Sequence, residues 1–171
     1  MNKFVFVLLG VLLINTLTFA QQTKFNNTKV GNVYNIDFPE YMTRTYGLNN
    51  SASAQYHNAE KEAYTIVIDD EKEEIKMVGI EIKDLEGYYE FFMEGFKLDS
   101  SEIISKNTIT INNLNAIQVE IVGSIDSTKI YYIITFVDSK EYYYNIISWT
   151  LYEFKESLIN DYKKIAASLK E

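Results

Sequence analysis

Two neighbouring stretches decide the fold: IYYIITFV at residues 130–137 and YYYNIISW at residues 142–149. Both are rich in β-branched and aromatic side chains, which favour half-buried strands. The polar sequence DSKE between them, residues 138–141, is only long enough for a turn. We therefore predict two consecutive strands that pair as an antiparallel hairpin.

The second of these stretches places aromatic side chains on both faces of the predicted sheet, because neighbouring side chains alternate along a strand. Tyr142 and Tyr144 share one face, and Tyr143 lies on the other with Ile147 and Trp149. Half-buried aromatic side chains usually pack against helices, which predicts a sheet covered on both sides. The alternative is an exposed tyrosine platform that binds a protein or a sugar.

Further strands and one helix are expected before this hairpin. Apolar residues between 84 and 97 recur at helical spacing and predict a helix there. Residues 47–51 are typical of a turn or mobile loop. The predicted strands are 33–38, ended by Pro39; 41–46; 52–56 paired with a central strand at 63–69; 103–105; 108–111; and 116–125.

The end of the chain predicts a second, amphipathic helix. Its apolar positions are separated by three or four residues, the spacing of one helix face. Runs of strands with helices before and after them indicate an α+β fold, an antiparallel β-sheet flanked by helices. The positions of the apolar stripe are Leu151, Phe154, Leu158, Tyr162, Ile165 and Leu169.

Four of these segments together resemble the PsbP-like proteins, a family that includes small bacterial envelope proteins of the DcrB type. They are YNIDFP at 34–39, YTIVID at 64–69, the long strands within 130–149, and Phe154-x10-IAASL ending at residue 169. The resemblance implies a PsbP-like α/β/α sandwich formed by residues 30–171 as a single domain. Because family members mostly bind or assist other proteins, it also implies a protein partner.

The first twenty residues, MNKFVFVLLGVLLINTLTFA, are typical of a signal peptide. Lys3 precedes an apolar run at 4–14, and Thr18 and Ala20 are the small residues expected before a cleavage site. The run is too short for a membrane anchor, which needs about 20 apolar residues, so no transmembrane segment is expected after cleavage. We predict an exported protein, periplasmic or extracellular, that begins with a flexible arm at 21–29.

The charge of the chain argues against a nucleic-acid partner. It carries 16 Lys and Arg against 24 Asp and Glu, a formal net charge of -8, and this sign repels phosphate backbones. Arg44 is the only arginine, so bidentate clamps on phosphate are nearly excluded. There is no cysteine, and a domain of this length can bury a sufficient core without disulfides or metal.

Few residues suggest catalysis or metal binding. His57 is the only histidine, and neither a cysteine nor a Gly-x-Ser-x-Gly sequence supplies a nucleophile for it to activate. The acidic run at 69–74 is a candidate cation site, but Asp70-x-x-Glu73 is better explained as the capping box of a short helix. We expect no cofactor, no metal and no catalytic residue.

These observations favour a non-enzymatic envelope protein that binds another protein as an accessory or assembly factor. The first alternative is a small-ligand or glycan-binding module that uses exposed aromatic side chains. A less favoured alternative is a hydrolase that uses a pair of scattered carboxylates. Tyr41, Arg44 and Tyr46, beside the loop at 47–53, are the candidate partner surface.

Overall fold

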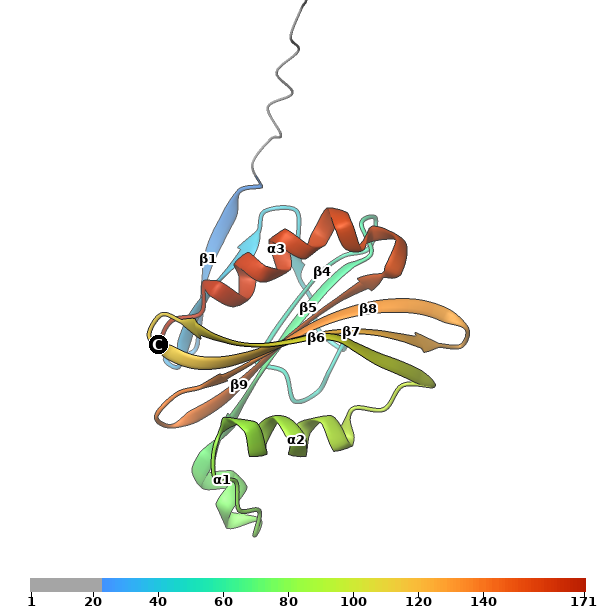
Figure 1. Cartoon of the computed structure of the whole chain (residues 1–171). Helices are drawn as coiled ribbons and strands as arrows, with labels where there is room; N and C mark the ends of the chain where they lie inside the picture. Colours follow the sequence, from blue (N-terminus) through green and yellow to red (C-terminus); the bar gives the residue numbers. More distant parts are fainter. Residues whose placement is uncertain (1–22) are drawn as a thin grey trace, which may run out of the picture.

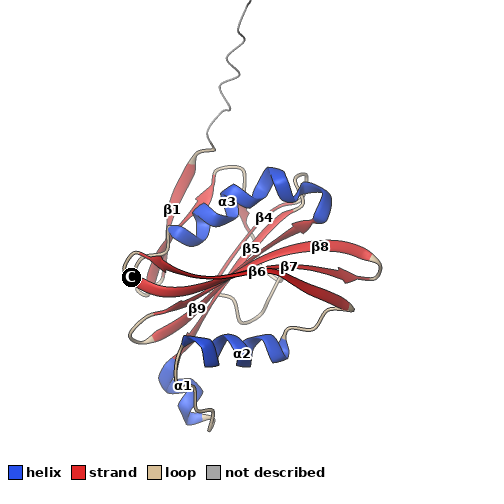
Figure 2. Cartoon of the chain, in the orientation of Figure 1, coloured by secondary structure: helices blue, strands red, loops and turns tan. Residues whose placement is uncertain are grey.

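The chain forms one large sheet with a helix on each face and a small second sheet beside one of the helices (Figures 1 and 2). The computed structural model describes residues 23–171. The strands are β1 (Phe25–Val30), β2 (Tyr34–Pro39), β3 (Thr43–Arg44), β4 (Ala54–Asn58), β5 (Ala63–Glu71), β6 (Ser100–Ile111), β7 (Leu114–Ile125), β8 (Thr128–Asp138) and β9 (Tyr142–Leu151). The helices are α1 (Lys72–Met77), α2 (Leu85–Gly95) and α3 (Lys155–Ala167), the last preceded by a 3₁₀ turn, η1 (Tyr152–Phe154).

The large sheet is antiparallel throughout, in the order β3-β4-β5-β9-β8-β7-β6. The hairpin predicted from the sequence is confirmed, since β8 pairs with β9 and places Tyr132 opposite Trp149. The β4–β5 hairpin is confirmed as well. Because β5 also pairs with β9, the two halves of the chain meet in the interior of the sheet.

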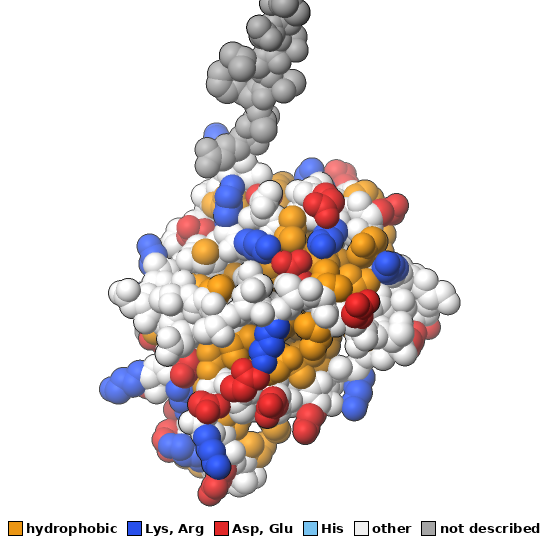
Figure 3. Space-filling view, in the orientation of Figure 1, with side chains coloured by type: hydrophobic (Ala, Val, Ile, Leu, Met, Phe, Trp, Pro, Cys, Tyr) orange, Lys and Arg blue, Asp and Glu red, His pale blue; other side chains and the backbone are white. Residues whose placement is uncertain are grey.

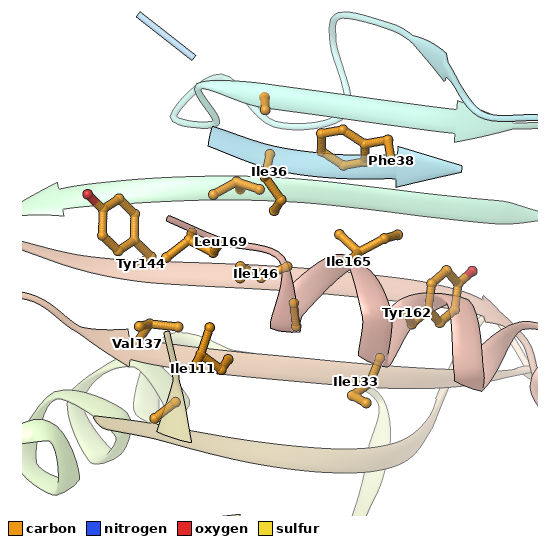
Figure 4. Packing of buried hydrophobic residues seen from close by; sticks show 14 of the residues in the cluster. Ile36, Phe38, Ile111, Ile133, Val137, Tyr144, Ile146, Tyr162, Ile165 and Leu169 are labelled. Atoms are coloured by element: carbon orange, nitrogen blue, oxygen red, sulfur yellow. The ribbon is translucent and has the colours of Figure 1, made fainter. Parts of the chain in front are cut away.

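Helix α3 and the small β1–β2 sheet cover one face (Figure 4). Tyr144 and Ile146 of β9 belong to the same buried cluster as Tyr162 and Ile165 of α3. Each fully buried aliphatic or aromatic side chain of this kind contributes roughly 1.5–3 kcal/mol. The predicted C-terminal amphipathic helix is therefore confirmed, and it closes an α+β fold.

The buried stripe of this helix begins later than its spacing suggested. Leu151 ends β9 instead of opening the helix. Phe154 lies in η1 and is 37% exposed, so it does not belong to the core. Leu158, Tyr162 and Ile165 are buried as expected. The chain turns sharply out of β9 before the helix begins, which displaces the first two positions of the stripe.

Helix α2 covers the opposite face only in part. Near its start, Tyr88 stacks on Tyr143 of β9 with 4.1 Å between ring centroids. Farther along, Phe92 and Phe96 contact β8, and the helix packs on β7 and β8. The face of β5 and β9 around Trp149 is left beside the helix and not beneath it.

The N-terminal segment differs in part from the prediction. The predicted signal peptide at residues 1–20 lies outside the described residues. Of the predicted flexible arm, 21–29, residues from Phe25 onward form β1, which pairs antiparallel with β2. Within residues 23–171, no helix is both long and apolar enough to cross a membrane.

Three local predictions are corrected by the structure. The strand expected at 41–46 is reduced to the two residues of β3, and the two strands expected at 103–111 are one strand, β6, with an irregularity between Ile103 and Ser105. The capping box Asp70-x-x-Glu73 is wrong, because β5 continues through Asp70 and α1 has Glu71 at its N-cap without a side-chain cap.

Candidate functional site

An open groove of about 940 Å³ lies between the second half of α2, the loop that contains Leu48 and Asn49, and the neighbouring strands of the sheet. Its position follows from the partial cover that α2 gives to this face. Most of its lining is apolar or aromatic, and its charged residues are Glu94 and Lys97. The lining residues are Leu48, Asn49, Ile66, Ile68, Phe91, Phe92, Glu94, Gly95, Phe96, Lys97, Ile125, Tyr132, Ile147 and Trp149.

The sheet supplies the floor of the groove. Ile66 and Ile68 come from β5, Ile147 and Trp149 from β9, and Tyr132 from β8. These residues point to the same face because each set is spaced by two along its strand. All are buried except Trp149, which is partly exposed. The only tryptophan of the chain therefore lies at the groove surface.

Trp149 belongs to a row of aromatic side chains that crosses four strands and ends at Phe96, the C-cap residue of α2. Ring centroids are 6.3 Å apart between His57 and Tyr64, and 5.3 Å apart between Tyr64 and Trp149, whose rings are stacked. The row continues over 6.4 Å from Trp149 to Tyr132 and 5.3 Å from Tyr132 to Phe96. Edge-on and stacked rings thus form one continuous aromatic surface, and Trp149, Tyr132 and Phe96 of this surface line the groove.

Gln55 holds the loop that forms one wall. Its side chain is 8% exposed, and its Oε1 accepts hydrogen bonds from the backbone N–H groups of Leu48 at 2.8 Å and Asn49 at 3.2 Å. Its Nε2 donates to the carbonyl oxygen of Asn49 at 2.7 Å. A buried amide with these partners is costly to remove, so the loop has a defined position against the sheet.

The opposite wall is α2, which is fixed at both ends. Asp84 caps its start, because its Oδ1 accepts from the N–H of Gly87 at 2.9 Å. Beyond its end, the chain passes close to β7 at Gly123, where a Cβ would lie 2.4 Å from the Leu98 side chain and 2.8 Å from the Ser100 carbonyl oxygen. Only glycine allows this approach, which places the end of α2 beside the groove.

The electrostatic character of the groove is set by its rim. Glu94 and Lys97 are both exposed to solvent. Burial raises the pKa of the Tyr132 hydroxyl above its ordinary value, and burial together with the hydrogen bond to Glu62 raises the pKa of Tyr64. Both phenols are therefore neutral near pH 7, and the floor carries no charge.

The predicted partner surface is only partly assembled. The Arg44 guanidinium lies 5.5 Å from the ring centroid of Tyr46, which is 77% exposed. Tyr41 is instead half-buried, and its hydroxyl donates to Asp161 Oδ2 at 3.0 Å. Burial and the Asp161 charge raise the pKa of Tyr41. None of the three predicted residues lines the groove described above.

The other sequence candidates lie elsewhere. His57 is half-buried in β4, with its ring edge-on to Tyr64. Among residues 23–171, no three His, Cys, Asp or Glu side chains come together as candidate metal ligands.

Sequence reasoning did not single out the groove. One sequence feature could have indicated it. Phe91 and Phe92 are neighbours on a predicted helix, so they lie on different sides of the helix and cannot both pack on the sheet. Phe91 is indeed 43% exposed, and it lines the groove from its place on α2.

Comparison with known proteins defines the fold class. No protein-family model matches the chain, and no curated protein sequence is similar to it. Its structure is similar to the solution structure of cyanobacterial PsbP, CyanoP, from Synechocystis sp. PCC 6803, with a TM-score of 0.62 and 9% identity over 92% of this chain and 98% of that chain. The chain therefore has a PsbP-like fold.

Two further solved structures share this fold. LpqN, involved in cell envelope biogenesis of Mycobacterium tuberculosis, aligns with a TM-score of 0.56 and 10% identity over 86% of this chain and 90% of that chain. PA94, a protein of unknown function from Pseudomonas aeruginosa, aligns with a TM-score of 0.55 and 10% identity over 86% and 96%. At these identities the similarity concerns the fold alone.

Proposed function

We propose that this chain is an exported, non-enzymatic accessory protein of the cell envelope that binds a protein partner through the groove beside α2. The open apolar groove is the observation on which the proposal rests. Its apolar surface continues outward onto Phe91 and Ile125, which are 43% and 42% exposed. An exposed apolar surface of this kind with a charged rim is typical of a protein interaction site.

The chemistry of the lining supports binding over catalysis. Its ionisable side chains are Glu94, Lys97 and Tyr132. The first two are exposed at the rim of the groove. Burial holds the Tyr132 hydroxyl in its neutral form. We therefore assign the groove a binding role.

The envelope location rests on two supports. The leader-like sequence at residues 1–20 is typical of an exported protein. The structural similarity to LpqN, which is involved in cell envelope biogenesis, and to CyanoP agrees with an accessory role in that compartment. Neither comparison identifies the partner of this chain.

Site-specific photocrosslinking in the native envelope tests the proposal. We would place p-benzoylphenylalanine at Phe91 and, as a matched control, at Tyr152, which has a similar exposure of 41% and does not line the groove. We expect one discrete protein adduct from position 91 that disappears when Trp149 is replaced by Ala. Equal adducts at both positions, or none at position 91, would contradict the proposal.

A small apolar ligand is the second candidate, and the groove volume favours it. About 940 Å³ falls within the range of roughly 300–1,000 Å³ that is common for small-molecule sites. Native mass spectrometry of the protein purified from its own envelope separates the two candidates. A bound small molecule lost in the Trp149→Ala variant, without a protein adduct at position 91, supports this second function.

A further inference from the structure

The outward side of α2 departs from what a helix of a stable domain normally shows. Phe91 is exposed instead of packed. Glu94 lies in the last turn, which contains no basic residue. Gly95 ends the helix, although glycine is a poor helix former. Positions that break several local rules together are expected at functional sites.

Glu94 is unfavourably placed for the free helix. The C-terminal end of a helix carries partial negative charge from its unpaired carbonyl groups, and cations are favoured there. A carboxylate at this end is therefore repelled by the helix itself. Lys97 follows beyond the C-cap residue Phe96, outside the last turn. A cation brought by a partner would relieve this repulsion.

Gly95 leaves space at the groove. A Cβ at this position would meet no heavy atom within 4 Å, and its backbone is not in the left-handed region that requires glycine. Neither packing nor conformation thus accounts for glycine in the isolated chain. Glycine at this position would allow the backbone of another chain to approach the end of α2 closely.

The surroundings of the groove are predominantly acidic. Glu90 lies one turn before Glu94 on the outer part of α2, and Figure 3 shows acidic side chains gathered along this helix. At the other end, Asp126 follows the groove residue Ile125, and Asp99 Oδ2 accepts from the backbone N–H of Asp126 at 2.9 Å. The chain as a whole has a net charge of -8.

We propose that the segment bound by the groove is basic and amphipathic, a deepening that rests on the proposed function. Its apolar side chains fill the space over Trp149, and its Lys or Arg side chains meet Glu94 at the groove rim and Glu90 one turn earlier on α2, outside the groove lining. An amphipathic segment laid into an apolar groove is a common mode of peptide recognition. Complementary charge selects such a segment and speeds its association.

Titration of the purified mature chain with designed peptides tests this assignment. The probe is an amphipathic peptide of about 18 residues, five helical turns, built from Leu and Lys without aromatic residues. A second peptide has Glu in place of every Lys. Because Trp149 is the only tryptophan and lines the groove, its emission reports occupancy directly. We expect a blue shift with the Lys peptide and none with the Glu peptide.

Two double variants of equal net charge separate local from general attraction. Glu90→Gln with Glu94→Gln removes the carboxylates of α2, and Glu40→Gln with Glu60→Gln removes two exposed carboxylates that do not line the groove. We expect the first to weaken binding of the Lys peptide about fivefold, as for two exposed ion pairs. The second should leave the affinity within about twofold.

The variant Gly95→Ala should change stability and peptide binding in opposite directions. We expect a melting temperature raised by about 1–3 °C, because alanine favours the helix, together with weaker peptide binding. Equal affinities for the two double variants, or for the Lys and Glu peptides, would overturn the assignment. In that case a protein adduct at position 91 would still support the proposed function, whereas its absence would remove both.

Discussion

The hydroxyl of Tyr88 donates a hydrogen bond to Asp70 Oδ2, and this contact ties α2 to the last part of β5. The side-chain amide of Asn145, on β9, donates to both oxygens. Burial raises the pKa of Tyr88, and the negative charge of Asp70 raises it further, so the phenol keeps its proton. The first half of α2 is thereby fixed to two strands, while its second half forms the groove wall.

We expect Tyr88→Phe to destabilise the chain by about 1–3 kcal/mol, because Asp70 and Asn145 lose a partner in a partly buried position. Urea unfolding measures this change. Tyr89→Phe is the matched control: Tyr89 is also buried on α2, but its hydroxyl makes no side-chain hydrogen bond among residues 23–171. Equal losses for both variants would show that the contact with Asp70 has no special role.

Gln55 should control the groove wall. Gln55→Ala leaves the N–H groups of Leu48 and Asn49 without their partner, at a cost of about 1–3 kcal/mol. The loosened loop should expose Trp149 more, so acrylamide should quench its fluorescence more strongly than in the wild type. Gln118→Ala, which removes an amide that donates to Thr135 Oγ1 on the sheet, should leave the quenching unchanged.

Helix α3 should depend on Leu158 and not on Phe154. Leu158 is buried, so Leu158→Ala should cost about 2–5 kcal/mol. Phe154 is 37% exposed in η1, so Phe154→Ala should cost less than half as much. Thermal unfolding of the two variants checks the order. A larger loss of stability for Phe154→Ala than for Leu158→Ala would show that Phe154 belongs to the buried side of the helix, contrary to its place in η1.

Glu120 should link stability to pH on the α3 side. Burial alone would raise its pKa, but the Lys163 ammonium, whose Nζ lies 3.0 Å from Glu120 Oε1, and the charge of Lys155 lower it below the ordinary value of 4.5. A depressed carboxyl pKa adds stability above the ordinary value, and this stability is lost as the pH falls through the lower, folded-state pKa.

Glu120→Gln should therefore destabilise the chain at pH 7 by about 1–3 kcal/mol, and the difference from the wild type should shrink below about pH 4. Urea unfolding at a series of pH values measures both. Glu40→Gln, an exposed control, should show no such convergence. A difference that stays constant down to pH 3 would exclude the ionic role of Glu120.

The sequence predicts the central hairpin well. Two runs of β-branched and aromatic residues around a four-residue turn predict β8 and β9. Because neighbouring side chains of a strand point to opposite faces, Tyr143 and Tyr144 are expected in different layers, and the structure places them in opposite clusters. Strand β1 was missed because its sequence FNNTKV is mostly polar and is held by pairing with β2. Such pairing is a tertiary property that no local pattern records.

The candidate site was harder to predict for the same reason. Asp70 looked like a helix cap from its spacing to Glu73, yet it binds Tyr88, which is 18 residues away. The groove exists because α2 covers only part of one face of the large sheet. The position of α2 on this face cannot be predicted from the sequence of the helix or from that of the strands. Tyr41 is predicted to be exposed, but its hydroxyl donates a hydrogen bond to Asp161 of α3.

The two buried clusters share the strands β5, β7, β8 and β9 but no side chain. Substitutions at distant positions of the two clusters, which share no contacting side chain, should therefore have additive effects on the free energy of unfolding. Side chains of the α2 layer can therefore change while the contacts that hold α3 on the opposite face are kept.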